Sequence, residues 1–324
     1  MIRSAFRRLP ILLTGALLAA CLRADAGGGS VRLPLDSGQS EVLRVGALEY
    51  RGGVVLSSGT SGFGGLSGLA VAPDGGRMWA VTDRGALVTA NLAYDRGGLL
   101  SEARSIAVRP LIDSDGKPTE GSRSDSEDLT RLPGGDWVAA FERWHRISLY
   151  PGGEEGPVGI PTTLRRPPGL REEAPGNAGI EALAALPDGR LFAIEEGRED
   201  RAGSHRAWIG GADGWTQATY RGQAPYRPTG ATALPNGDVL VLERRASFLG
   251  GFGARIVRVP SGALASTVIE GEELARIEQP LEVDNFEGIA AAPADGGGWN
   301  VYVVSDDNFW ALQRTLLMMF HLPG

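Results

Sequence analysis

The strongest constraint on the fold is a short sequence that recurs five times. Each copy is a run of small and apolar residues that enters a proline-containing turn, as in Gly-Leu-Ala-Val-Ala-Pro-Asp-Gly at residues 68–75. The prolines of the five copies are 60, 54, 48 and 58 residues apart: Pro73, Pro133, Pro187, Pro235 and Pro293. A supersecondary unit that recurs about every 50 residues indicates an array or a propeller.

Each copy predicts a β-hairpin. Proline presets φ in the turn, and glycine or asparagine adopts the positive φ that a tight turn requires. A second run of apolar and aromatic residues follows each turn, at residues 78–81, 137–141, 191–194, 239–242 and 301–304. Such runs, bounded by turn signals, are typical of buried strands. Flanking segments such as 146–150 and 254–259 supply two further strands per unit, which predicts an all-β chain folded as a β-propeller.

The two ends of the chain predict a sixth blade. Residues 41–50 and 314–322 both have strand character. Pairing strands from the N- and C-terminal ends would close the ring and remove exposed sheet edges. We therefore expect one domain, residues 41–324, folded as a six-bladed propeller. A complete N-terminal blade and a short helix at residues 316–320 are the alternatives.

The N-terminus carries the features of a targeting segment. In residues 1–20, arginines precede an apolar stretch that is too short to span a membrane as a stable helix. Leu18-Ala19-Ala20-Cys21 resembles the lipobox of bacterial lipoproteins, which makes Cys21 the candidate for lipidation. Cys21 is the only cysteine, so no intramolecular disulfide can form. A plain signal peptide cut after Ala26 and a twin-arginine signal remain open.

These features predict where the protein resides and what it meets. Residues 21–40 include Gly27-Gly28-Gly29-Ser30 and would form a flexible tether. We expect an exported lipoprotein of the bacterial outer membrane that faces the periplasm, or a soluble periplasmic protein. The formal charge is −7 and becomes about −10 without residues 1–20, which argues against nucleic acid as a partner. We expect a monomer that contacts the membrane only through its lipid anchor.

Charged residues stand at the same places in the repeats. Glu127, Glu181 and Glu287 precede the first strand of their hairpins, whereas Glu142, Glu196 and Asp306 follow the second. The turn lies at the opposite end of each hairpin. Both sets are therefore predicted to lie together, with arginines, at one mouth of the central channel.

Several segments resemble one known family. They are Ser67-Gly68-Leu69, Thr82-Asp83-Arg84-Gly85, 177–183, 284–289, 305–309 and 313–317. In combination they are similar to the phytase-like family known as "esterase-like activity of phytase", over about residues 45–322. The resemblance implies a propeller, an exported bacterial location and a hydrolase activity.

The acidic residues predict a metal site. Calcium prefers six to eight oxygen ligands, which clustered carboxylates and amides provide. The candidate ligands are Glu127, Glu181, Glu287, Asp307 and Asn308, and the candidate catalytic acids are Glu181, Glu287 and Asp306. Arg84, Arg143 and Arg244 would bind the anionic part of a substrate. In the alternative interpretation, the acids bond backbone amides at blade ends or pair with these arginines.

Two classes of function fit the residues. A cation and arginines suit metal-assisted hydrolysis of a phosphate ester, or of a carboxylic ester or lactone. A serine triad is disfavoured, because no Gly-x-Ser-x-Gly elbow is present and the only histidines are His145, His205 and His321. The other class is a non-catalytic propeller that binds an envelope component, with Trp310 as an aromatic at the channel mouth.

Overall fold

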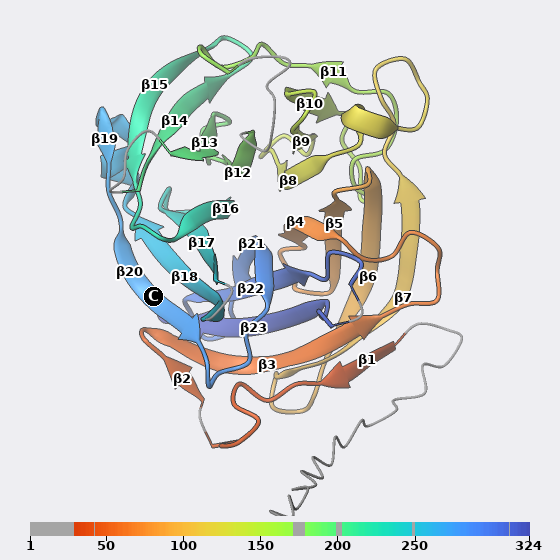
Figure 1. Ribbon diagram of the computed structural model, residues 1–324, viewed down its shortest axis with the longest axis vertical. Coiled ribbons are helices and arrows are strands. Elements are labelled where there is room, and N and C mark those ends of the chain that lie inside the picture. The colour runs from red at the N-terminus through yellow and green to blue at the C-terminus, as the bar shows by residue number, and fades with distance from the viewer. Residues whose placement is uncertain (1–28, 42, 171–178, 199–202, 248–249, 311) are drawn as a thin grey trace, which may run out of the picture.

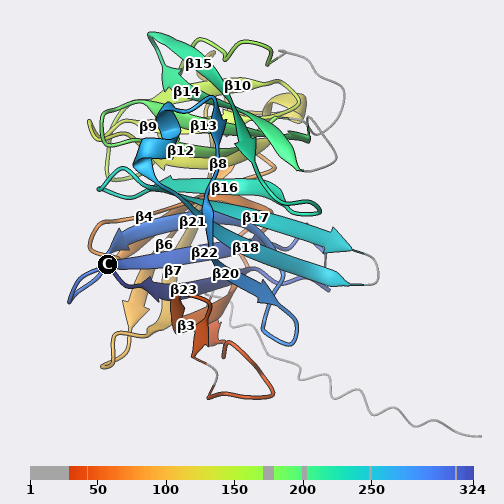
Figure 2. The same cartoon turned by 90° about the vertical axis from the view of Figure 1, so that its left-hand side faces the viewer.

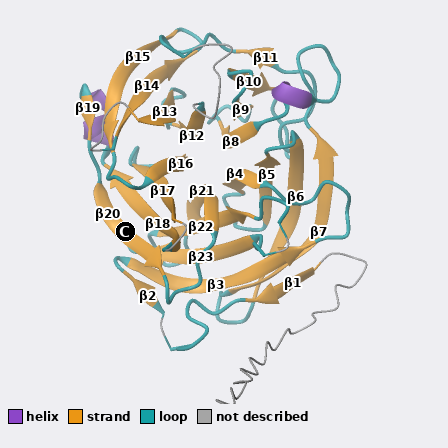
Figure 3. Ribbon diagram, viewed as in Figure 1, coloured by secondary structure: helices purple, strands orange, loops and turns teal. Residues whose placement is uncertain are grey.

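The computed structural model describes residues 29–41, 43–170, 179–198, 203–247, 250–310 and 312–324. The predicted targeting segment 1–20 and Cys21 lie outside these residues. In the described part, two short 3-10 helices, η1 (Gly121–Arg123) and η2 (Ser261–Ala265), accompany a fold built otherwise from strands (Figure 3). The described residues contain no helix with the length and hydropathy needed to cross a membrane. The chain is therefore all-β.

The described strands form five four-stranded antiparallel units around a central axis (Figure 1). From the axis outward, the first unit contains β4 (Leu66–Val71), β5 (Arg77–Thr82), β6 (Ala86–Tyr94) and β7 (Leu100–Pro110), and the second contains β8 (Ser126–Arg131), β9 (Trp137–Phe141), β10 (Arg146–Tyr150) and β11 (Thr162–Thr163). The third contains β12 (Ile180–Ala185), β13 (Leu191–Arg198), β14 (Ser204–Gly211) and β15 (Gly214–Arg221), and the fourth contains β16 (Arg227–Ala233), β17 (Val239–Ser247), β18 (Gly251–Val259) and β20 (Glu272–Glu278). The fifth contains β21 (Asn285–Pro293), β22 (Trp299–Asp306), β23 (Leu316–Leu322) and β3 (Leu48–Ser57). The short strand β19 (Val268–Ile269) adds to β15 in parallel.

The innermost strands form a closed ring. β4 contacts β8, and the contacts continue through β12, β16 and β21 back to β4. The perpendicular view shows the hairpins β12–β13, β16–β17 and β21–β22 as successive layers (Figure 2). This radial arrangement of four-stranded sheets is propeller-like.

Strands from both ends of the chain close the ring, as the sequence predicts. The C-terminal strand β23 lies between β22 and the N-terminal strand β3. The predicted sixth blade is wrong for the described residues, because the terminal strands complete the unit that begins with β21–β22. That hairpin has no other outer strands to pair with. Residues 316–320 are part of a strand, and the alternative of a helix there is wrong.

The folded unit begins before residue 41. β1 (Gly29–Arg32) pairs with β3, and β2 (Arg44–Val45) forms a hairpin with the start of β3. Leu35 is 1 % exposed and belongs to the core beneath β3. The predicted tether 21–40 is therefore wrong from Gly29 onward, because this segment has an edge to pair with and apolar side chains to bury.

The repeated turns have one geometry. The Gly75 N–H donates to the Ala72 carbonyl at 2.8 Å, and Gly75 has a φ of 72°. The same bond and a positive φ recur at Gly135, Gly189 and Gly237. Proline within the turn and glycine at its end thus fix these four hairpins locally. In the fifth hairpin, Pro293 ends β21 and the Gly297 N–H donates to the Ala294 carbonyl at 3.1 Å.

The glycines near the axis are required for a reason other than the conformation of a turn. A Cβ added at Gly288 would lie 2.2 Å from the Ser67 carbonyl oxygen, and one at Gly68 would lie 2.4 Å from the Leu129 nitrogen. Neighbouring inner strands approach too closely at these points for a side chain. The apolar core lies farther out, between units, where the rings of Trp79 and Trp137 are 5.1 Å apart.

Asp128 occupies the position of these glycines in its own repeat. Its Oδ1 accepts the Leu129 N–H at 2.7 Å, and its Oδ2 accepts the Leu183 N–H at 2.7 Å and the Ala231 N–H at 3.2 Å. The side chain is completely buried. One carboxylate therefore joins β8 to β12 and β16.

Candidate functional site

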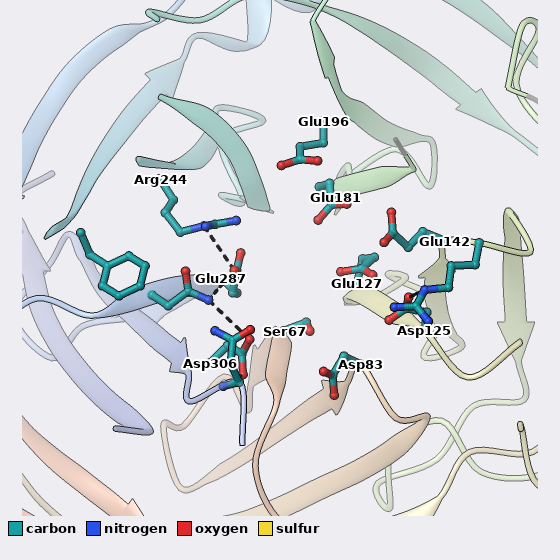
Figure 4. Close-up of a pocket in the computed structure, with 14 residues that line it drawn as sticks. Ser67, Asp83, Asp125, Glu127, Glu142, Glu181, Glu196, Arg244, Glu287 and Asp306 are labelled. Carbon is teal, nitrogen blue, oxygen red and sulfur yellow. Dashed lines mark hydrogen bonds and ion pairs between the residues drawn. The ribbon is translucent and has the colours of Figure 1, made fainter. Parts of the chain in front are cut away.

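A β-bulge in each inner strand positions the residues of the site. The pairing of each inner strand with its neighbour shifts by one residue near its start. The extra residue is Glu127 in β8, Glu181 in β12, Thr229 in β16 and Glu287 in β21, and it falls at Ser67-Gly68 in β4. A bulge leaves its extra residue out of the ladder and re-aims the side chain. Four of the five bulges thus contribute a side chain to one cavity (Figure 4).

The cavity has a volume of about 330 Å³. The C-terminal end of the second strand of each hairpin supplies the other side of the cavity. This follows because the start of the first strand pairs with the end of the second. We call it the acidic cavity, and it is lined by Ser67, Asp83, Asp125, Glu127, Glu142, Arg143, Glu181, Glu196, Arg244, Phe252, Asn285, Glu287, Asp306 and Asn308 (Figure 4).

Most of the predicted site residues meet here. The three candidate catalytic acids, Glu181, Glu287 and Asp306, all line the acidic cavity. Of the candidate metal ligands, Glu127 and Asn308 line it as well. The structure therefore brings together residues that lie up to 181 positions apart in the chain.

Two predicted residues are placed elsewhere. The Asp307 carboxylate accepts the Gly65 N–H at 2.9 Å, the Phe309 N–H at 3.0 Å and the Thr315 hydroxyl at 3.1 Å. Asp307 therefore holds a loop together and does not line the cavity. The Arg84 guanidinium lies over the Phe309 ring, 3.4 Å from its centroid, and is likewise outside the lining.

The densest acidic cluster was only partly predicted. Single oxygen atoms of Asp125, Glu127 and Glu142 all lie within 4.8 Å of one another. Asp125 stands two residues before Glu127, as Asn285 stands two residues before Glu287, and both line the acidic cavity. This equivalence between two repeats is the signal that was available.

Arginines neutralise part of the charge. Arg143 Nε lies 2.5 Å from Asp125 Oδ2, and Arg244 Nε lies 3.2 Å from Glu287 Oε1. The Asn285 amide donates to Glu287 Oε1 at 2.9 Å. Figure 4 shows Arg244 and Glu287 across the cavity from Asp125 and Glu142. The site thus has two halves, a carboxylate cluster and an arginine–glutamate pair.

Burial and mutual repulsion raise the pKa values of these acids. Desolvation, with the charges of Asp125 and Glu196, raises the pKa of Glu142 to about 7. Desolvation also raises the pKa of Glu287 to about 7 despite the opposing charge of Arg244. The pKa of Asp306 rises to about 6, again mainly through burial. The pKa values of Glu127 and Glu181 lie well above their usual range for the same reasons.

Glu181 and burial act on Glu142 in opposite directions. A side-chain hydrogen bond with Glu181 lowers the pKa of Glu142, which burial raises. The pKa of Glu181 itself is raised well above its usual range by burial and by the charges of Glu127 and Glu142. Neighbouring carboxyl groups of this cavity therefore influence one another's pKa values.

The donor set fits a hard divalent cation. Carboxylate oxygens are the ligands that calcium prefers, and Asp125, Glu127 and Glu142 offer three in close proximity. A cation would also offset the repulsion that, after burial, raises the pKa values of Glu127 and Glu142. Thr229, the bulged residue of β16, takes no part, because its hydroxyl donates to the Phe286 carbonyl at 3.2 Å.

Comparison with known proteins gives one family match. The model of a family described as "Phytase-like: Esterase-like activity of phytase" matches residues 61–309. No curated protein matches the sequence.

Solved structures match the chain at low identity. The PQQ-bound aldose sugar dehydrogenase of Streptomyces coelicolor is 16 % identical, with 83 % of this chain and 97 % of that chain covered and a TM-score of 0.43. The virginiamycin B lyase of Staphylococcus aureus is 11 % identical, with 90 % and 99 % covered and a TM-score of 0.40. Likeness at this level supports no inference about activity.

Proposed function

Because the chain belongs to the phytase-like family, we propose that it is a metal-assisted hydrolase of phosphate or carboxylic esters, with the acidic cavity as its active site. The observation that carries the proposal is the cluster of Asp125, Glu127 and Glu142, whose oxygens lie within 4.8 Å of one another in a cavity that also contains two arginines.

Asp125, Glu127 and Glu142 would hold the cation, which we propose to be calcium. When bound, a divalent cation neutralises anionic oxygens of the ester and polarises the phosphorus or carbonyl centre. The guanidinium groups of Arg143 and Arg244 retain N–H donors beyond those that face Asp125 and Glu287. These donors would orient the substrate's oxygens.

Two carboxyl groups suit the proton transfers. Glu181, whose pKa burial and the neighbouring acids raise well above its usual range, would donate a proton to the leaving oxygen. Asp306, whose pKa is about 6, is mostly ionised at pH 7 and would accept a proton from the attacking water. Glu287 would keep Arg244 in place through their ion pair.

The test measures phosphate release from phytate, and hydrolysis of a carboxylic ester and a lactone, by the purified full chain with calcium and then with chelator. We expect calcium-dependent turnover of at least one substrate. Glu181→Gln and Glu287→Gln should abolish turnover without unfolding the protein. Glu154→Gln, at a residue whose side chain is 80 % exposed outside the cavity, is the matched control. Loss of folding in both cavity variants would instead make these carboxylates structural and would refute the assignment.

A second function, a binding platform without catalysis, is favoured by one observation. Trp310 is 69 % exposed and Leu312 is 91 % exposed, both close in sequence to the cavity residue Asn308. Exposed apolar side chains beside a polar cavity suit binding of an envelope component. This function predicts no turnover of any ester with or without calcium, and loss of partner binding in Trp310→Ser.

The cellular setting remains part of the proposal. We infer export to the bacterial envelope, lipidation at Cys21 and a monomer that faces the periplasm, from the arginine-led apolar segment and the lipobox-like sequence. Labelling of the full chain with a lipid precursor, compared with Cys21→Ser, tests the anchor.

A further inference from the structure

One turn contributes to two different cavities. Between β9 and β10, Glu142 and Arg143 line the acidic cavity, whereas the next three residues line a second cavity of about 410 Å³. The turn is sharp, since Arg143 has a φ of 54° and the Trp144 N–H donates to the Glu142 carbonyl at 2.5 Å. We call the second one the arginine cavity, lined by Asp113, Ser114, Arg123, Trp144, His145, Arg146, Thr163, Leu164, Arg165 and Arg166.

The arginine cavity carries an excess of positive charge. Arg123, Arg146 and Arg165 line it together with a single acid, Asp113. Arg123 Nη1 lies 2.8 Å from Asp113 Oδ2, and Arg146 Nε lies 3.8 Å from Asp113 Oδ1, so two guanidinium groups share one acid. Arg165 is exposed and forms no ion pair with the described part of the chain. A concave surface with this charge attracts anions.

Buried polar groups in the lining have bonding capacity left over. His145 is 1 % exposed, and neither of its ring nitrogens has a hydrogen-bond partner among the described residues. Burial, together with the charge of Arg166, lowers the pKa of His145, so its ring is neutral and one nitrogen carries a hydrogen. Arg146 is 5 % exposed and its Nε lacks a hydrogen-bond partner as well. Buried donors without partners cost stability, and a ligand that accepts from them would remove that cost.

We propose that the arginine cavity binds a phosphate or sulfate group of a small molecule, at a site separate from the acidic cavity. Arginine forks match the oxygens of such groups and bind them with charge-assisted hydrogen bonds. Donors come from three segments, the end of η1 (Arg123), the start of β10 (Arg146) and the residues after β11 (Arg165). This distribution suits a tetrahedral anion, whose oxygens point in several directions, better than a planar carboxylate.

The experiment titrates the full chain with inorganic phosphate, and separately with sulfate and acetate, by calorimetry at constant ionic strength. Chelator is present throughout, so that a divalent cation in the acidic cavity cannot bridge to the anion. We expect binding of phosphate or sulfate, and weaker binding of acetate. Arg165→Gln should raise the Kd about tenfold, the effect of losing one charge-assisted contact. Arg190→Gln, an exposed arginine paired with Asp188 outside the cavity, should leave the Kd unchanged.

Two results would overturn the proposal. One is the absence of binding by the unmodified chain in the millimolar range. The other is an equal Kd for Arg165→Gln and Arg190→Gln, measured on proteins with matched melting temperatures. Arg165→Lys, which keeps the charge, should bind with intermediate affinity and guards against a misfolded glutamine variant. If Arg165→Gln has no effect and Arg244→Gln weakens binding, the anion occupies the acidic cavity, which refutes the second site and leaves the proposed hydrolase untouched.

Discussion

Removing the carboxylate of Asp128 should destabilise the whole protein, although Asp128 does not line the acidic cavity. Its two oxygens accept three backbone N–H groups, those of Leu129, Leu183 and Ala231. The latter two belong to β12 and β16, and the side chain is completely buried. Asp128→Ala leaves all three donors without an acceptor, in a place that water does not reach.

The size of the effect follows from the number of orphaned donors. Each buried polar group without a partner costs about 1–3 kcal/mol, so Asp128→Ala should lose about 3–9 kcal/mol. A natural domain is stable by only about 5–15 kcal/mol, so this variant should be mostly unfolded or nearly so. Asp128→Asn keeps one acceptor oxygen and should lose about 1–3 kcal/mol, because at least one N–H then meets the amide NH₂.

Urea unfolding of the full chain, followed by tryptophan fluorescence, measures both losses as shifts of the midpoint at constant slope. Asp188→Asn is the matched control, since Asp188 lies in an exposed turn and should change the stability by less than about 0.5 kcal/mol. If Asp128→Ala lies within about 1 kcal/mol of the parent protein, the three bonds do not hold the inner strands together and the reasoning fails.

Three further predictions rest on the ring and the cavity. Gly288→Ala should lose about 3 kcal/mol or more of unfolding free energy in the same assay, because the new Cβ would lie 2.2 Å from a backbone oxygen. Gly134→Ala should be neutral, because a Cβ added there has no atom within 4 Å. Equal stabilities of the two variants would contradict the close approach at Gly288. With chelator present, stability should fall as pH rises from about 4.5 to 7, because Glu142 and Glu287 have pKa values of about 7 and the folded state binds more protons than the unfolded state. Calcium should reduce this dependence of stability on pH, and it should bind more tightly at higher pH. A melting temperature that is independent of pH and calcium would refute the cation cluster. Deleting residues 314–324 should abolish cooperative unfolding, because β23 lies between β22 and β3. Circular dichroism during heating measures this loss of cooperativity. A truncated chain as stable as the full chain would disprove ring closure by both termini.

Much of the acidic cavity could be predicted because the repeats are equivalent. Glu127, Glu181 and Glu287 occupy the same place in three hairpins, so one inference about hairpin direction places all three. Asp125 was not among the predicted residues, although it is equivalent to Asn285, which also stands two residues before the bulged glutamate of its hairpin. Asp307 stands beside Asp306 in the sequence, yet its carboxylate turns to the backbone of residues 65 and 309. Asp306 is the last residue of β22, whereas Asp307 lies beyond the strand, where hydrogen bonds to the Gly65 and Phe309 N–H groups hold its carboxylate outside the cavity lining.

The sequence by itself determined the elements that depend on local chemistry. Proline and glycine specify four of the turns and glycine specifies the fifth, and apolar runs of four or five residues specify the strands on either side of them. Only the tertiary structure decided the number of units and the composition of the cavity. The terminal strands β3 and β23 share one sheet, and bulges at the inner strands turn Glu127, Glu181 and Glu287 inward. Both depend on contacts between residues far apart in the chain, such as Gly288 against Ser67, whose closeness no local pattern encodes.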